Sequence, residues 1–233
     1  PPHIFLAIRF LLASLILSFL CWPQLIQITR NQTYRAFGTG LLLGLTLLMW
    51  VIALDQSESI GEGAFIVSLT VVFVPLIWRL FLGDSRTISL LLALIPAISG
   101  LALLSLQVSD DQTLSFSFEQ SHLYFLLSTI GFAFHVILTS RFGQKIPAIP
   151  LATIHLSAIG LVALISALLT ENWPPEIHAV SWFWLLCSAV IATSLRFALQ
   201  TKALIYLNPS NATMIFMLEP VWVAVLGALF LTE

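Results

Sequence analysis

Residues 150–170 of the chain read PLATIHLSAIGLVALISALLT, a stretch without a single Asp, Glu, Lys or Arg. A helix needs about 20 predominantly apolar residues to cross the hydrocarbon core of a bilayer, so this stretch is long enough to span a membrane. Similar apolar stretches occupy residues 3–22, 35–54, 61–82, 87–107, 121–140, 181–206 and 210–232. The sequence therefore predicts an all-α membrane helix bundle of about eight transmembrane helices joined by short loops.

The composition supports the same conclusion. Of 233 residues, 59% are hydrophobic and only 9% are charged, whereas a soluble domain carries roughly 25% charged residues. The net charge of −2 leaves no basic surface for nucleic acid, so the lipid bilayer is the expected partner. Cys21 and Cys187 both lie in apolar stretches, where packing as small hydrophobic side chains is expected rather than a disulfide or a metal site.

Charged residues between the stretches alternate in sign. Loops after odd-numbered stretches carry the basic side chains, which are Arg30, Arg35, Arg79, Arg86, Arg141, Lys145 and Lys202. Loops after even-numbered stretches carry only acidic ones, which are Asp55, Glu58, Glu62, Asp110, Asp111, Glu119, Glu171 and Glu176. Because basic loops stay in the cytoplasm, we expect a multi-pass protein of the bacterial cytoplasmic (inner) membrane. Pro1 and Glu233 are then on the outer side.

Two segments of the chain resemble each other. Residues 73–84 read FVPLIWRLFLGD and residues 222–233 read WVAVLGALFLTE, so Val, Leu-Phe-Leu and a final acid recur at matching places. They close the third and the eighth predicted helices, which are five helices apart. An odd separation makes the two copies run through the membrane in opposite directions. Such inverted repeats are typical of secondary transporters.

The chain also resembles the EamA-type branch of the drug/metabolite transporter superfamily. Three stretches carry this resemblance. The first is Ala64-Phe65-Ile66 followed by residues 69–76, and the second is Ala192-Thr193 followed by Phe197 and Leu199-Gln200. The third is Leu218-Glu219-Pro220-Val221 followed by Glu233. The resemblance implies an inverted-repeat architecture of ten helices, of which this chain holds the second to the ninth. Residues 1–108 would be the first repeat without its first helix, and residues 120–233 the second repeat without its last. The chain departs from the pattern at Asp84, Arg196 and Thr232, where the family usually has Glu, a small or aromatic residue, and Gly.

That resemblance implies a secondary active transporter that exports small organic metabolites or drugs by alternating access. No P-loop is present, so an ion gradient or exchange is the expected energy source, with protons as candidate partners and no cofactor. A non-transporting scaffold or a degenerate transporter fragment is the alternative. An intramembrane enzyme is the more remote one, because neither Gly-x-Ser-x-Gly nor His-Glu-x-x-His occurs. We therefore do not expect an enzyme.

Three charged residues fall deep inside predicted helices, away from the helix ends, namely Arg9, Arg196 and Glu219. A charge at the bilayer centre costs about 2.5–3.5 kcal/mol on insertion scales, so each needs a partner or a water-filled cavity. Arg196 and Glu219 fall near mid-depth on consecutive antiparallel helices, which predicts that they pair. The pair would either bind substrate and couple protons, or hold two helices together. Gln200 lies one turn from Arg196 on the same face and can join either arrangement.

The remaining cavity candidates are less specific. Arg9 lies about seven residues from the outer end of its helix, and it either snorkels to the headgroups or lines a cavity. His135, like His155, is more typical of a helix-packing group than of a metal ligand. Trp50 could stack on a substrate, although core or lipid contact is the commoner role. The candidate substrate or ion residues are therefore Arg196, Glu219, Gln200, Arg9, Trp50 and His135, and no metal site is expected.

Small residues form one further pattern. Gly40 and Gly44 are spaced four apart, with Gly38 nearby. Small residues at this spacing let helix backbones approach closely within a membrane. Helix packing is the expected role of Gly40 and Gly44.

Overall fold

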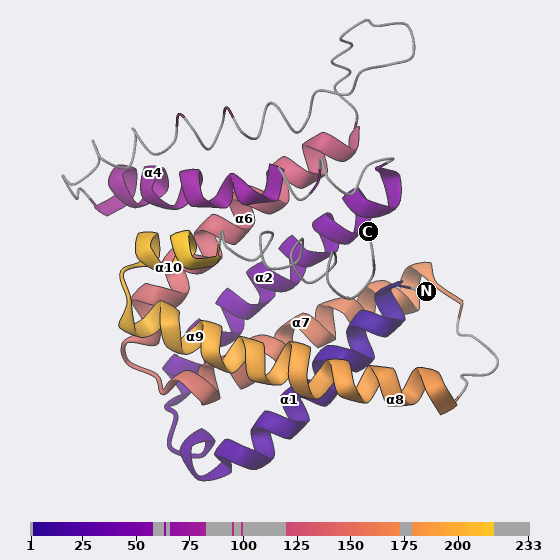
Figure 1. The fold of residues 1–233 in the computed structure, drawn as a ribbon. Helices are drawn as coiled ribbons and strands as arrows, with labels where there is room; N and C mark the ends of the chain where they lie inside the picture. Colours follow the sequence, from indigo (N-terminus) through magenta and orange to yellow (C-terminus); the bar gives the residue numbers. More distant parts are fainter. Residues whose placement is uncertain are drawn as a thin grey trace, which may run out of the picture. The chain divides into compact units, whose positions relative to one another are not determined.

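The computed structural model describes residues 2–57, 63, 66–82, 95, 99, 120–172 and 179–216 (Figure 1). Its helices are α1 (Pro2–Leu25), α2 (Arg30–Gln56), α4 (Thr70–Leu82), α6 (Gln120–Gly143), α7 (Ala148–Thr170), α8 (Ala179–Cys187), the π-helix η1 (Ser188–Leu195), α9 (Arg196–Tyr206) and α10 (Pro209–Phe216). Over these residues the fold is helical and contains no strand, which confirms the all-α prediction.

Five helical segments are long and apolar enough to cross a membrane. They are Pro2–Leu25, Arg30–Gln56, Gln120–Gly143, Ala148–Thr170 and Ala179–Tyr206, and each coincides with a predicted helix. Their outward surface is apolar, since Phe19 is 83% exposed and Leu169 80% exposed. A shorter apolar helix, Ile66–Phe81, falls within predicted helix 61–82. Two predicted helices lie largely outside the described residues: almost all of 87–107, and the part of 210–232 that follows Phe216. The count of eight transmembrane helices therefore stays a prediction.

The chain forms two compact units. Unit 1 comprises Pro1–Leu48 and His135–Asn208, and unit 2 comprises Met49–Phe134 and Pro209–Glu233. In unit 2, the Thr129 hydroxyl of α6 donates to the Ile66 carbonyl at 3.0 Å. The Phe81 and Phe134 rings meet edge to face with centroids 6.1 Å apart, and α10 packs on α4. Unit 1 holds most of the polar contacts discussed below.

Helices α1 and α7 pack against each other in antiparallel directions within unit 1. The Ser14 hydroxyl donates to the Thr153 carbonyl at 3.1 Å, and a Cβ added at Gly160 would lie 2.7 Å from Leu11 Cγ. At the end of α7, the Glu171 carboxylate accepts the backbone N–H groups of His3 (2.9 Å) and Ile4 (2.8 Å). The first N–H groups of a helix lack intrahelical acceptors and carry partial positive charge, so this carboxylate caps α1 favourably.

Glycines bring α2 into close contact with α7. A Cβ added at Gly40 would lie 2.8 Å from Ala158 Cβ and 2.9 Å from His155 Cα, and one at Gly44 would lie 3.1 Å from Val162 Cβ. Such distances leave no room for a larger side chain at Gly40. The prediction of a helix-packing face at Gly40 and Gly44 is therefore confirmed.

Two predicted breaks differ in the structure. The first helix ends later than the predicted stretch 3–22, because α1 continues through Pro23 to Leu25, with a kink at Cys21 (φ −116°, ψ 19°). A proline inside a helix removes one N–H and clashes with the preceding turn, which explains a kink. The placement of Arg30 to Gln32 in a break is also wrong, since α2 begins at Arg30. Thr29 and Gln32 form a capping box, with Thr29 N–H on Gln32 Oε1 at 2.9 Å and Gln32 N–H on Thr29 Oγ1 at 3.4 Å.

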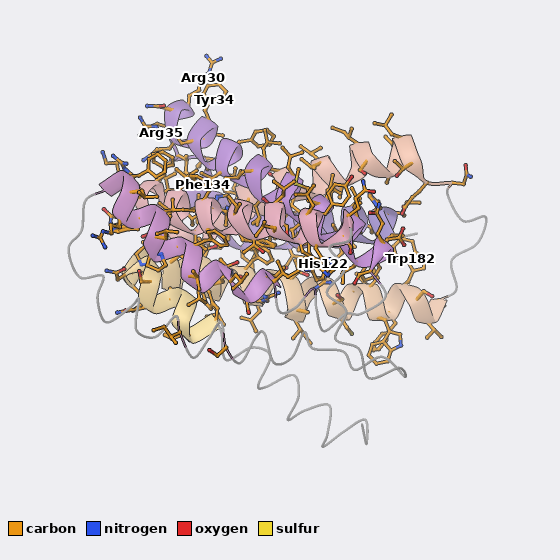
Figure 2. All side chains as sticks on the ribbon, turned by 90° about the horizontal axis from the view of Figure 1, so that it is seen from above. Arg30, Tyr34, Arg35, His122, Phe134 and Trp182 are labelled. Carbon is orange, nitrogen blue, oxygen red and sulfur yellow. The ribbon has the colours of Figure 1, made fainter. Side chains whose placement is uncertain are left out.

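The two ends of unit 1 carry different charges. At one end, the Gln32 amide donates to the Lys145 carbonyl at 2.6 Å, which joins the α1–α2 turn to the α6–α7 turn. The basic residues of this end are Arg30 and Arg35, which project from the first turns of α2 (Figure 2), with Lys145 and its neighbour Arg141. At the other end, Glu171 meets the start of α1. Within unit 1, the basic residues named above therefore lie at one end and Glu171 at the other, while the side of the membrane that each end faces stays a prediction.

Candidate functional site

The helical segment Ala179–Tyr206 is not uniform. Its middle part, Ser188–Leu195, is a π-helix, in which each turn contains about one residue more than in an α-helix. The Thr193 hydroxyl donates to the Ser188 carbonyl at 3.1 Å, and the Ser194 hydroxyl donates to the Ala189 carbonyl at 2.8 Å. Side-chain hydroxyls thus satisfy carbonyls five residues earlier. Widened turns of this kind occur frequently at functional sites.

Arg9 of α1 makes a hydrogen bond to this widened turn. Its Nε–H donates to Thr193 Oγ1 at 2.6 Å. Thr193 can accept because its own hydroxyl proton is directed to the Ser188 carbonyl. The Arg9 guanidinium carbon also lies 5.9 Å from the Phe5 ring and 6.0 Å from the Phe10 ring, within cation–π distance. Arg9 is therefore joined to a neighbouring helix by one hydrogen bond, and it lies beside two aromatic rings of its own helix.

A second guanidinium lies close to the first. Arg196 begins α9 directly after the π-helix, three residues or about one turn beyond Thr193, and its side chain is exposed. It lies near enough for its charge to act on that of Arg9. Gln200 is half-buried one turn further along α9. We name Arg9, Thr193 and Arg196 the arginine cluster. Two like charges in a medium of low dielectric constant repel each other, so the cluster favours a negatively charged group between them.

Two buried histidines form a separate polar network in unit 1. The Thr39 hydroxyl of α2 lies 2.8 Å from His155 Nε2, and the Thr39 carbonyl lies 3.2 Å from His135 Nδ1. Since a carbonyl only accepts, His135 carries a proton on Nδ1, and its Nε2 faces the Thr139 hydroxyl at 3.4 Å. The two rings meet edge to face with centroids 5.1 Å apart. This network links α2, α6 and α7 in the way expected of helix-packing groups.

The other predicted site residues are not placed relative to the arginine cluster. Trp50 is half-buried and belongs to unit 2. Glu219 lies outside the described residues, so its pairing with Arg196 stays a prediction. Within the part of the chain that the structure describes, no group of three or more His, Cys, Asp or Glu side chains could hold a metal ion.

Sequence reasoning did not single out Thr193 or Thr39 as polar partners. A hydroxyl in a transmembrane helix ordinarily bonds to its own backbone, as Thr46 does with the Leu42 carbonyl at 2.7 Å. Nothing in the sequence distinguishes such a residue from one that also reaches another helix. The one available signal was indirect, because a charge such as Arg9 inside a membrane helix requires a polar partner.

Comparison with known proteins shows what parts of the chain are similar to. Residues 120–233 match the model of the EamA-like transporter family. Over 204 residues the chain is 24% identical to "Uncharacterized transporter YvbV" of Bacillus subtilis (strain 168), which covers 84% of this chain and 61% of that protein. The chain thus spans less than two thirds of this relative's length. A solved structure described as "Crystal structure of protein" shares the fold, with a TM-score of 0.77 at 13% identity over 98% of this chain and 78% of the other.

Proposed function

We propose that the protein is a secondary active transporter, because residues 120–233 match the EamA-like transporter family that the sequence motifs resemble. It exports small organic metabolites or drugs across the cytoplasmic membrane by alternating access. The family match is the observation that carries this proposal. A relative named as a transporter and five segments able to cross a membrane agree with it.

Features of the described helices suit this role. In secondary transporters, substrate sites lie where helices depart from regular geometry near the midplane. Helix α1 is kinked at Cys21, and Ala179–Tyr206 widens into a π-helix that contacts Arg9. Residues 1–108 and 120–233 would be the two inverted repeats, with the substrate bound between them.

Counterflow tests the transport activity directly. The full-length protein is reconstituted into liposomes preloaded with one unlabelled metabolite at a time, and entry of the same labelled metabolite is followed. We expect transient accumulation above equilibrium for at least one solute. A scaffold gives none for any solute, and that result would refute the proposal.

Proton coupling through Glu219 is a further part of the proposal. In the same liposomes, an outward proton gradient (acidic lumen) should accelerate uptake by the unmodified protein, because a proton-coupled exporter moves its substrate in the direction opposite to the protons. Glu219→Gln removes the titratable group at nearly constant size, so uptake should lose its dependence on the gradient while counterflow persists. Uptake by this variant that still follows the gradient would show that another group carries the proton.

Orientation is tested with two exposed positions at the opposite ends of unit 1, Lys145 and Asn172. Each is replaced by cysteine in a background where Cys21 and Cys187 are serine. A membrane-impermeant maleimide should label Asn172→Cys in cells with a permeabilised outer membrane, and Lys145→Cys only after the inner membrane is opened. The reverse pattern would invert the proposed topology.

A further inference from the structure

The arginine cluster combines Arg9, which is hydrogen-bonded to Thr193, with a second positive charge, Arg196, one turn beyond Thr193 on the same helical segment. Arg9 Nε donates to Thr193 Oγ1, and this contact uses one of the five N–H donors of the guanidinium. The other four lie on the two Nη groups, which form the fork that binds carboxylate or phosphate oxygens in pairs. Thr193 is itself fixed by its bond to the Ser188 carbonyl. The guanidinium is therefore oriented before any ligand arrives.

The cluster lies far from the lipid headgroups. Thr193 is 14 residues from Ala179 and 13 residues from Tyr206, the two ends of this 28-residue segment. At roughly 1.5 Å per residue, each end is about 20 Å away. The hydrocarbon core is about 30 Å thick, so Thr193 falls near its middle. Arg9 extends to this depth instead of turning towards the surface.

The charges do not balance within the predicted helices. Arg9, Arg196 and Glu219 are the charged residues that the sequence places deep inside them, away from the helix ends. Even if Glu219 pairs with Arg196, one positive charge remains. Phe10 meets Phe197 edge to face, with ring centroids 5.6 Å apart, and both rings lie beside the cluster. Apolar surroundings strengthen the attraction between a guanidinium and an oxyanion.

We propose that the arginine cluster binds the oxyanion group, carboxylate or phosphate, of a small organic solute. This inference rests on the proposed transport function and assigns it a substrate class, organic anions. Arg9 forms the charge-assisted pair, Arg196 adds the second positive charge, and Thr193 positions Arg9. The alternative is that Arg9 is only a tether between α1 and the π-helix.

Binding is measured as a ligand-dependent rise in melting temperature of the full-length protein in phosphatidylcholine nanodiscs. The probes are benzoate, phenylacetate and phenyl phosphate, and their neutral counterparts are benzamide, phenylacetamide and phenol. At least one anion should raise the melting temperature in a saturable way, and its neutral counterpart should not. Equal responses to both members of every pair, or no response to any anion, would overturn the inference.

Variants then separate ligand binding from tethering. Arg9→Gln should raise the half-saturating anion concentration by about tenfold or more, as expected for loss of a charge-assisted pair. Thr193→Ser keeps the acceptor and should leave the value unchanged, whereas Thr193→Val should raise it severalfold. Arg30→Gln is the matched control, because Arg30 likewise bonds a hydroxyl through Nε (Tyr34 Oη, 3.0 Å) but is exposed. If Arg9→Gln does not fold, Arg9→Lys retains the charge without the fork and should bind more weakly.

The remaining outcomes distinguish the two proposals and the source of the anion. A shift produced by phosphatidylglycerol in the nanodiscs, but by none of the soluble anions, would identify a lipid contact and overturn the solute site. Counterflow of neutral solutes that is unaffected by Arg9→Gln would overturn the anion site and leave transport standing. Saturable, Arg9-dependent anion binding without counterflow of any solute would support the site and refute transport.

Discussion

Gly40→Ala is the smallest change that tests the packing of α2 on α7. The added Cβ would meet Ala158 Cβ at 2.8 Å and His155 Cα at 2.9 Å. Neither atom can rotate away, because one is backbone and the other is fixed to it. The two helices must therefore move apart by several tenths of an ångström.

The magnitude follows from a comparison within the same helix. Gly38→Ala is the matched control, since among the described residues nothing lies within 4 Å of its added Cβ. Both substitutions gain helix propensity of about 1 kcal/mol. Only Gly40→Ala also overpacks the interface, which typically costs about 1–3 kcal/mol. Gly38→Ala should therefore be more stable than Gly40→Ala by about 1–3 kcal/mol, with Gly44→Ala in between.

The assay is thermal unfolding of the three variants in the same detergent, followed by the loss of the monodisperse chromatographic peak. One kcal/mol corresponds to roughly 2–4 °C for a chain of this size. The expected order of melting temperatures is Gly38→Ala, then Gly44→Ala, then Gly40→Ala. A melting temperature of Gly40→Ala at or above that of Gly38→Ala would refute the close packing of α2 and α7.

Two further substitutions address the polar contacts of unit 1. Glu171→Ala removes the acceptor of two N–H groups at the start of α1, so it should lower the free energy of unfolding by about 0.5–2 kcal/mol, measured as a lower melting temperature. Glu171→Gln should melt between the unmodified protein and Glu171→Ala. Equal melting temperatures of all three proteins would contradict the cap. Thr39→Val leaves a buried nitrogen of His155 without its hydroxyl and should cost about 1–3 kcal/mol. Thr39→Ser keeps the hydroxyl and should therefore keep the stability of the unmodified protein. Equal melting temperatures of Thr39→Val and Thr39→Ser would argue against the contact between Thr39 and His155.

Hydropathy was sufficient to locate the long helices but not their ends. The predicted helix 150–170 and α7 (Ala148–Thr170) nearly coincide. Pro147 and Pro150 mark its start, and the polar residues Glu171 and Asn172 mark its end. Helix α2 begins earlier than predicted, since Arg30, Asn31 and Gln32 are polar and were interpreted as loop. The capping-box pattern at Thr29 and Gln32 was present in the sequence and would have predicted the observed start.

The candidate site was only partly predictable. Arg9 and Arg196 could be identified because a charge in an apolar stretch is conspicuous. The contact that brings their helices together could not, because Arg9 and Thr193 are 184 residues apart along the chain and such a separation gives no pattern of its own. The π-helix between Ser188 and Leu195 was also missed, since its residues are as apolar as those of an ordinary transmembrane helix. Tertiary contacts, rather than local propensity, determine where such a widened turn forms.

The contact between Arg9 and Thr193 has a consequence for biosynthesis. Thr193 is made 184 residues after Arg9, and Glu171 is made 168 residues after His3. At about 5–20 residues per second, the ribosome needs roughly 10–40 seconds to cover that distance. During this interval α1 carries an arginine without its eventual acceptor and a first turn without its cap. The nascent helix must therefore wait beside the insertion machinery or near the headgroups until the later helices arrive, and an early departure into lipid would expose the chain to quality control.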